Sequence, residues 1–193
     1  MDKKKYGFFE SVFLSMTGLV IYNCVIQFFV YPSFNKVLGA EKFGDLLTLL
    51  AVMSILAVSV GSGVNLSRLA VSTRFKASNG DFNIFLLICA AVCAVAAAVI
   101  VLVFGGQGAM SAVLFPVVVV IVMLRYYSDC EFKLTLNYRR FFLYYLILSA
   151  ATAVGVLIFK LSSVWELVFI FGELPAVLYV VFRGGIYRSP FKT

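Results

Sequence analysis

Long apolar stretches, separated by short segments with charges, glycine or proline, constrain the fold of this chain more than any other feature. About 20 apolar residues cross a bilayer as a helix, because lipid tolerates only structures that satisfy their own backbone hydrogen bonds. The pattern predicts an all-α integral membrane protein, a six-transmembrane-helix bundle in a single domain, 1–193. The predicted spans are 10–31, 45–66, 82–104, 109–130, 141–159 and 164–182.

Composition excludes an ordinary soluble domain, because 63% of the residues are hydrophobic and only 13% are charged. The formal net charge of +7 raises the question of nucleic acid binding. However, the basic residues are scattered between apolar spans and do not form one stripe, so we expect membrane lipids and no nucleic acid as partners.

The distribution of lysine and arginine predicts the orientation, since cytoplasmic loops carry the excess of positive charge. Three of the 16 basic residues, Lys36, Lys42 and Lys160, fall on one side of the six spans. The others fall on the opposite side: Lys3, Lys4, Lys5, Arg68, Arg74, Lys76, Arg125, Lys133, Arg139, Arg140, Arg183, Arg188 and Lys192. We therefore expect a cytoplasmic (inner) membrane protein with both termini in the cytoplasm.

Breakers and small residues predict local features of the bundle. Proline, glycine and charges over 32–44 predict a membrane-surface loop between the first two spans. Ala151 and Gly155, four residues apart, predict close helix contact in the fifth span. Aromatic residues near span ends, such as Tyr126-Tyr127 and Tyr144-Tyr145, are typical of an interfacial belt.

Signatures of an enzyme or a metal site are missing from the sequence. There is no histidine, and Cys89 and Cys93 have helical rather than zinc-ligand spacing. Hydrolase elbows, zinc-protease motifs and phosphate-binding loops are also missing. We expect no enzymatic activity, no metal and no cofactor.

Polar residues inside predicted spans are the candidate functional groups, because hydrocarbon makes each of them costly. Asn23 and Gln27 lie one helical turn apart and either line a polar cavity or form an interhelical hydrogen bond. Glu173, in the sequence Gly-Glu-Leu-Pro of the sixth span, either faces a polar lumen or couples to protons or cations, or is a neutral hydrogen-bonded group at a helix contact.

Several arginines gather on the predicted cytoplasmic side. Arg68, Arg74 and Arg125 have the fork geometry that suits a phosphate, although topology and attraction to anionic lipid also explain them. Arg125 and Asp129 stand four residues apart, which predicts an intrahelical ion pair.

Two segments resemble the first hairpin of bacterial polysaccharide-exporting flippases, relatives of the multidrug-and-toxin extruders and the lipid-linked-oligosaccharide flippases. They are VYPSFNKVLGAEKFGDLL (30–47) and VGSGVNLSR (60–68). The family motif, a Leu-Gly-x-x-x-Phe/Tyr-Gly loop followed by a glycine-rich end of helix two, matches Leu38, Gly39, Phe43, Gly44, Gly61 and Gly63. The segment 132–140 is also similar, and beyond the first 70 residues the likeness is in hydropathy.

The resemblance implies a flippase or exporter subunit that moves a lipid-linked glycan, or another anionic amphiphile, by alternating access. Family members carry two six-helix lobes and this chain supplies one, so a homodimer, or a heterodimer with another half-transporter, is implied. Asn23, Gln27 and Glu173 would line the cavity, and Arg68, Arg74 and Arg125 would attract the diphosphate. The alternative is a non-transporting scaffold or accessory subunit of a polysaccharide or envelope biosynthesis complex.

Overall fold

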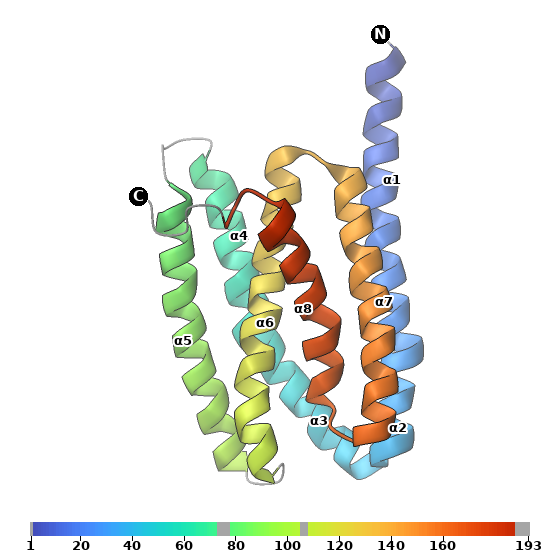
Figure 1. Ribbon diagram of the computed structural model, residues 1–193, viewed down its shortest axis with the longest axis vertical. Coiled ribbons are helices and arrows are strands. Elements are labelled where there is room, and N and C mark those ends of the chain that lie inside the picture. Colours follow the sequence, from blue (N-terminus) through green and yellow to red (C-terminus); the bar gives the residue numbers. More distant parts are fainter. Residues whose placement is uncertain (1, 73–77, 105–107, 188–193) are drawn as a thin grey trace.

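The computed structural model describes residues 2–72, 78–104 and 108–187, and every regular element within these ranges is a helix (Figure 1). Six continuous helical segments follow one another, close to the predicted spans. Their elements are α1 (Asp2–Val25), the π-helical turn η1 (Ile26–Val30), α2 (Tyr31–Leu38), α3 (Ala40–Met53), the π-helical turn η2 (Ser54–Val58), α4 (Ser59–Ser72), α5 (Asn79–Phe104), α6 (Gly108–Thr135), α7 (Tyr138–Ser162) and α8 (Glu166–Arg183).

Within the described residues, five helical segments are long and apolar enough to cross a membrane, so the chain is a multi-pass helical membrane protein. They are Phe9–Leu38, Ala40–Val71, Asn79–Val103, Met110–Thr135 and Tyr138–Ser162. The sixth segment, α8, has 18 residues and includes Glu166, Glu173 and Arg183. A sixth crossing and a flippase-like lobe therefore stay predictions.

The predicted loop over 32–44 is wrong, because the chain is helical there except at Gly39. Pro32 lies in the first turn of α2, directly after the π-helical turn η1. The altered hydrogen-bond register of a π turn accommodates a residue that has no backbone N–H. The break between α2 and α3 falls at Gly39, whose φ of 82° is one that glycine adopts without strain.

Helix α6 lies at the centre of the bundle, where it packs against α4, α5 and α8 (Figure 1). On the other side, α7 packs between α8 and α1. Aromatic side chains fill the layer between these helices, as in the edge-to-face pair of Phe132 of α6 and Phe141 of α7 with ring centroids 5.7 Å apart. The core thus runs through α6, α7 and α8.

Glycines let α7 and α8 approach closely. A Cβ added at Gly155 would lie 2.8 Å from the Val168 carbonyl oxygen, and one at Gly172 would lie 2.6 Å from Oγ1 of Thr152. Only a residue without a side chain allows such backbone proximity. The predicted close helix contact at Gly155 is therefore confirmed.

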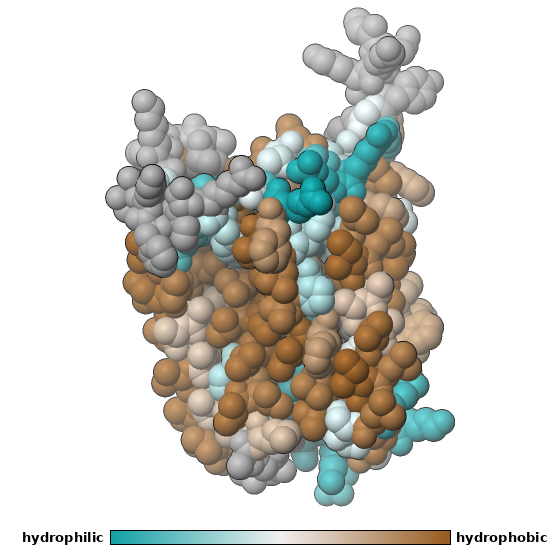
Figure 2. All heavy atoms as spheres, viewed as in Figure 1, coloured by the Kyte–Doolittle hydropathy of each residue, from teal (hydrophilic) through white to brown (hydrophobic). Residues whose placement is uncertain are grey.

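Different helix ends and turns lie at the two ends of the bundle. Helix α1 begins and α8 ends at one end, here called the N-terminal end, while α2, α3 and the α7–α8 turn lie at the far end (Figure 1). Figure 2 shows hydrophobic residues over most of the middle of the visible face and hydrophilic residues near the two ends. This distribution suits a protein whose middle faces lipid.

Candidate functional site

Glu173 lies on the buried face of α8, inside the bundle. Phe169, Gly172, Glu173 and Ala176 share this face because they follow the helical period. The Glu173 side chain is only 3% exposed, and its Oε1 accepts a 2.7 Å hydrogen bond from the Tyr22 hydroxyl of α1. The carboxyl group therefore connects the first and last helices of the described chain.

Arg125 of α6 supplies the cation beside this carboxyl. Its Nε lies 3.4 Å from Oε2 of Glu173, and its side chain is 3% exposed. The guanidinium carbon lies 4.1 Å from the ring centroid of Tyr126, 5.0 Å from that of Tyr22 and 5.4 Å from that of Tyr145. Aromatic faces attract a desolvated cation, so the three tyrosines stabilise the buried guanidinium together with Glu173.

Asp129 does not form the predicted ion pair with Arg125. Its Oδ2 instead accepts a 3.0 Å hydrogen bond from the Tyr145 hydroxyl of α7. The ion pair of Arg125 within the described residues is the one with Glu173, because the core position of α6 brings α8 within reach. Arg125, Glu173, Asp129, Tyr22 and Tyr145 are together called the Arg125 cluster below.

The Arg125 cluster has one guanidinium and two carboxyl groups. It is therefore electrically neutral only when one carboxyl carries a proton. Oδ1 of Asp129 has no hydrogen-bond partner in the described structure, and Nε of Arg125 and Oε2 of Glu173 face each other at 3.4 Å as an ion pair but form no hydrogen bond. Buried polar atoms are normally paired, and incompletely paired charges at membrane depth are typical of functional sites. The arrangement can hold a proton or exchange one partner for another.

Asn23 and Gln27 are not brought together with Glu173. Both side chains are exposed, Asn23 on α1 and Gln27 on the η1 turn that continues it, and the Asn23 amide donates to the Leu19 carbonyl one turn earlier. They continue an exposed stripe with alternating spacings of four and three, formed by Phe9, Phe13, Met16, Val20, Asn23 and Gln27. This spacing is the one by which a helix packs along another helix.

Arg68 joins helices at the N-terminal end and is itself buried, with 6% exposure. It donates to the Tyr127 hydroxyl of α6 and to Oδ1 of Asn79 of α5, and lies over the ring of Phe82. These contacts account for its position without a phosphate. Arg74 lies outside the described residues. The other two arginines expected to attract a phosphate, Arg68 and Arg125, have different partners and lie in two separate sites.

The two tyrosines of the site, Tyr22 and Tyr145, were not predicted from the sequence. Tyr144 and Tyr145, expected in an interfacial belt, are 0% and 1% exposed and lie in the core. The sequence does contain one signal for Tyr22. Gly18 stands one turn before it, and a Cβ there would lie 3.1 Å from Cβ of Tyr145. The small residue thus marks the face of α1 that contacts α7.

Comparison with known proteins finds no matching family model, no similar curated protein and no similar solved structure.

Proposed function

We propose that this chain is a six-helix lobe of a membrane flippase that moves a lipid-linked glycan, or a similar anionic amphiphile, across the cytoplasmic membrane by alternating access. One observation carries the proposal. A guanidinium and two carboxyl groups are buried together inside an apolar helix bundle, with one ion pair 3.4 Å long between them and Oδ1 of Asp129 without a hydrogen-bond partner. Ionisable groups at such depth are costly, and they mark ion or substrate pathways in membrane proteins.

The proposed mechanism uses Arg125 as an exchangeable partner. An anionic head group that reaches the guanidinium competes with Glu173, because phosphate oxygens match the arginine fork better than a single 3.4 Å contact does. Glu173 then loses its cation, and a proton on the carboxyl offsets the cost of leaving it buried. Release of the head group restores the pair. Substrate movement and proton uptake are thereby linked at one residue.

Tyr22 connects this exchange to helix movement. Its hydroxyl ties α1 to Glu173 of α8, while its ring lies edge-to-face on Tyr145 of α7 with centroids 6.2 Å apart. A change at Glu173 therefore alters how α1 is held against α7 and α8. Rigid-body rocking of one lobe against the other is the way in which such transporters alternate their access.

The exposed stripe of α1 is the proposed surface for a second lobe, from a second copy of the chain or from another half-transporter. Asn23 and Gln27 would face the route between the lobes, where amides are paired or hydrated. The charge distribution supports an orientation with both chain ends in the cytoplasm. The substrate head would then enter from the inner leaflet.

A non-transporting scaffold is the second candidate, and one observation favours it. Arg125 and Glu173 are each 3% exposed, so the cluster is closed to solvent in this structure. A scaffold would keep the cluster closed permanently as a helix contact, whereas a flippase must open it during each cycle.

A glycan-export measurement in the native cell distinguishes these functions. Glu173→Gln keeps the shape of the side chain and removes its charge, and we expect lipid-linked glycan to accumulate on the inner leaflet. Glu10→Gln is the matched control, since Glu10 forms only an exposed ion pair with Arg139, 2.8 Å long. If neither Glu173→Gln nor Arg125→Gln changes export, the proposed flippase function is wrong.

A further inference from the structure

A groove of about 500 Å³ lies on the surface of the bundle at its far end, away from the Arg125 cluster. It is formed by the turn η1, by α2 and by the last turn of α7. Its lining includes Phe28, Phe29, Ser33, Lys36, Val37 and Lys160, and none of its lining residues is acidic. The groove therefore combines two aromatic rings with two ammonium groups.

The groups that would select a ligand are open to it. Phe28 is 72% exposed and Phe29 is 61% exposed, and the two lysine side chains are exposed as well. A molecule in the groove can therefore contact the rings and the ammonium groups directly. Most of the groove belongs to the segment Phe9–Leu38, which is long and apolar enough to cross a membrane, so the molecules next to it are lipids.

A buried aromatic contact holds the two lysine-bearing helix ends together. The rings of Phe34 in α2 and Phe159 in α7 lie edge to face with centroids 4.9 Å apart, and both side chains are 0% exposed. Lys36 lies in the last turn of α2, and Lys160 lies in the last turn of α7. The fold thus brings two positive charges to one groove.

The two lysines have no acidic partner in the part of the chain that the structure describes. The ion pairs found there are those of Arg125 with Glu173 and of Arg139 with Glu10. The negative end of a helix dipole favours each lysine singly, but two like charges beside one groove repel each other. An anion between them offsets this repulsion, and a phosphate is an anion that lysine binds well.

The charged and apolar parts of the groove follow one another along the helix. Lys36 comes eight residues after Phe28, which corresponds to about 12 Å of helical rise. Because α2 ends at Leu38, Lys36 lies nearer the end of the bundle and the two phenylalanines lie nearer its middle. A phospholipid has the same order along the membrane normal, with a phosphate at the surface and acyl chains below it.

This order decides which class of ligand fits. A soluble anion would pair with the lysines but leave the rings without a partner, and a neutral hydrocarbon would do the reverse. A zwitterionic lipid such as phosphatidylcholine carries a cation next to its phosphate, which the lysines repel. An anionic phospholipid satisfies both parts of the groove without this repulsion.

We propose that this groove binds one anionic phospholipid of the leaflet at the far end. The phosphate lies between Lys36 and Lys160, and an acyl chain packs on Phe28 and Phe29. The volume falls within the range of small-ligand sites, roughly 300–1,000 Å³. The inference goes beyond the flippase function, since a lipid held at this end is independent of transport.

Quenching by brominated lipid measures which lipid occupies the groove. Phe29→Trp places a fluorophore there, and the parent chain, whose only tryptophan is the buried Trp165, gives the background. The full-length protein is reconstituted in phosphatidylcholine nanodiscs with increasing fractions of dibrominated phosphatidylglycerol. Nanodiscs with dibrominated phosphatidylcholine give the unselective quenching. We expect a preference of about tenfold for phosphatidylglycerol beside the groove.

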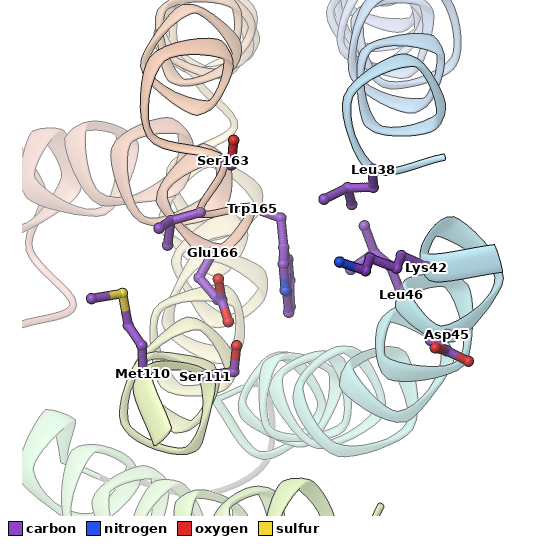
Figure 3. A pocket seen from close by; sticks show the side chains of 10 residues that line it. Leu38, Lys42, Asp45, Leu46, Met110, Ser111, Ser163, Trp165 and Glu166 are labelled. Atoms are coloured by element: carbon purple, nitrogen blue, oxygen red, sulfur yellow. The ribbon is translucent and has the colours of Figure 1, made fainter. Parts of the chain in front are cut away.

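Two sets of charge variants locate the preference. In the Phe29→Trp chain, Lys36→Gln combined with Lys160→Gln removes both charges and should abolish the preference. Lys42→Gln is the matched control and should leave it unchanged, because Lys42 is a basic residue at the same end that lines a different pocket, beside Trp165 (Figure 3). All three lysines are exposed, so these substitutions leave the packing of the bundle intact.

Each other outcome overturns the lipid site. Equal quenching by the two brominated lipids means that the groove does not select an anionic head group. A preference that the double lysine variant retains, or that Lys42→Gln lowers as much, comes from the surface charge in general. Loss of the preference when inorganic phosphate is added at constant ionic strength means that the site takes a soluble anion. None of these results depends on glycan export, which is measured separately.

Discussion

The Tyr22 hydroxyl donates a 2.7 Å hydrogen bond to Oε1 of Glu173 across a sequence separation of 151 residues. This bond joins α1 to α8 within the bundle, and Arg125 of α6 lies on the other oxygen of the same carboxyl group. Glu173 is therefore held by two helices at once. Its two oxygens have different partners, since Oε1 accepts the hydrogen bond from Tyr22 of α1 and Oε2 faces the guanidinium of Arg125 of α6.

Removal of the Tyr22 hydroxyl tests the first of these contacts. Tyr22→Phe keeps the ring that packs on Tyr145 but leaves Oε1 of Glu173 without its donor, so we expect the free energy of unfolding to fall by about 1–3 kcal/mol. Chemical unfolding in mixed micelles, followed by the helical circular dichroism signal, measures the change. Tyr179→Phe on α8 is the control, since Tyr179 is only half-buried, and an equal loss in both variants would contradict the account.

Separate removal of the two charges tests the ion pair. Arg125→Leu leaves Glu173 buried without its cation, and we expect a loss of about 3–5 kcal/mol in unfolding free energy. The double variant with Arg125→Leu and Glu173→Leu replaces both charges by apolar groups, and its loss should be smaller than that of the single variant. Additive losses in a double-mutant cycle would mean that the two side chains do not interact.

The close approach of α7 and α8 gives a third prediction. Gly155→Ala would place a methyl group 2.8 Å from the Val168 carbonyl oxygen, so α8 must move, at a cost of about 1–3 kcal/mol. Gly63→Ala on α4 meets nothing within 4 Å and should be neutral or stabilising by about 0.5–1 kcal/mol, because alanine favours the helix. Equal unfolding midpoints for the two variants would show that the helices are not closely packed at Gly155.

The exposed stripe of α1 gives a fourth prediction, which concerns the second lobe. Asn23→Leu combined with Gln27→Leu should change the unfolding free energy by no more than about 0.5 kcal/mol, since both side chains are exposed. The same double variant should reduce dimer formation. Cys24, exposed on the same helix, allows cross-linking in the membrane to measure the dimer fraction. Undiminished cross-linking in the double variant would exclude these amides from the contact between lobes.

The helical segments were largely predictable from the sequence, because the spacing of apolar residues and breakers is a one-dimensional signal. The exception is the segment 32–44, where Pro32 and the charges indicate a loop. The π-helical turn at Ile26–Val30 accommodates the proline, and the chain breaks only at Gly39. A π turn has no clear sequence signature, so this part of the prediction was wrong.

The partners within the Arg125 cluster were much less predictable. Glu173 is recognisable because it is a carboxylate within an apolar span. Its pairing with Arg125 depends on the packing of α6 against α8, which the spacing of either helix alone does not encode. Spacing within one helix instead indicated an Arg125–Asp129 pair, and the structure places the Tyr145 hydroxyl on Asp129.

Translocation by purified protein tests the central claim most directly. The chain is reconstituted in liposomes with a fluorescent polyprenyl diphosphate, and dithionite added outside reports how much of the lipid changes leaflet. We predict that the wild type and Glu10→Gln accelerate this exchange over protein-free liposomes, and that Glu173→Gln slows it about tenfold, the equivalent of about 1.4 kcal/mol. Equal rates for Glu173→Gln and the wild type, or no exchange above protein-free liposomes, would contradict a flippase centred on the Arg125–Glu173 pair.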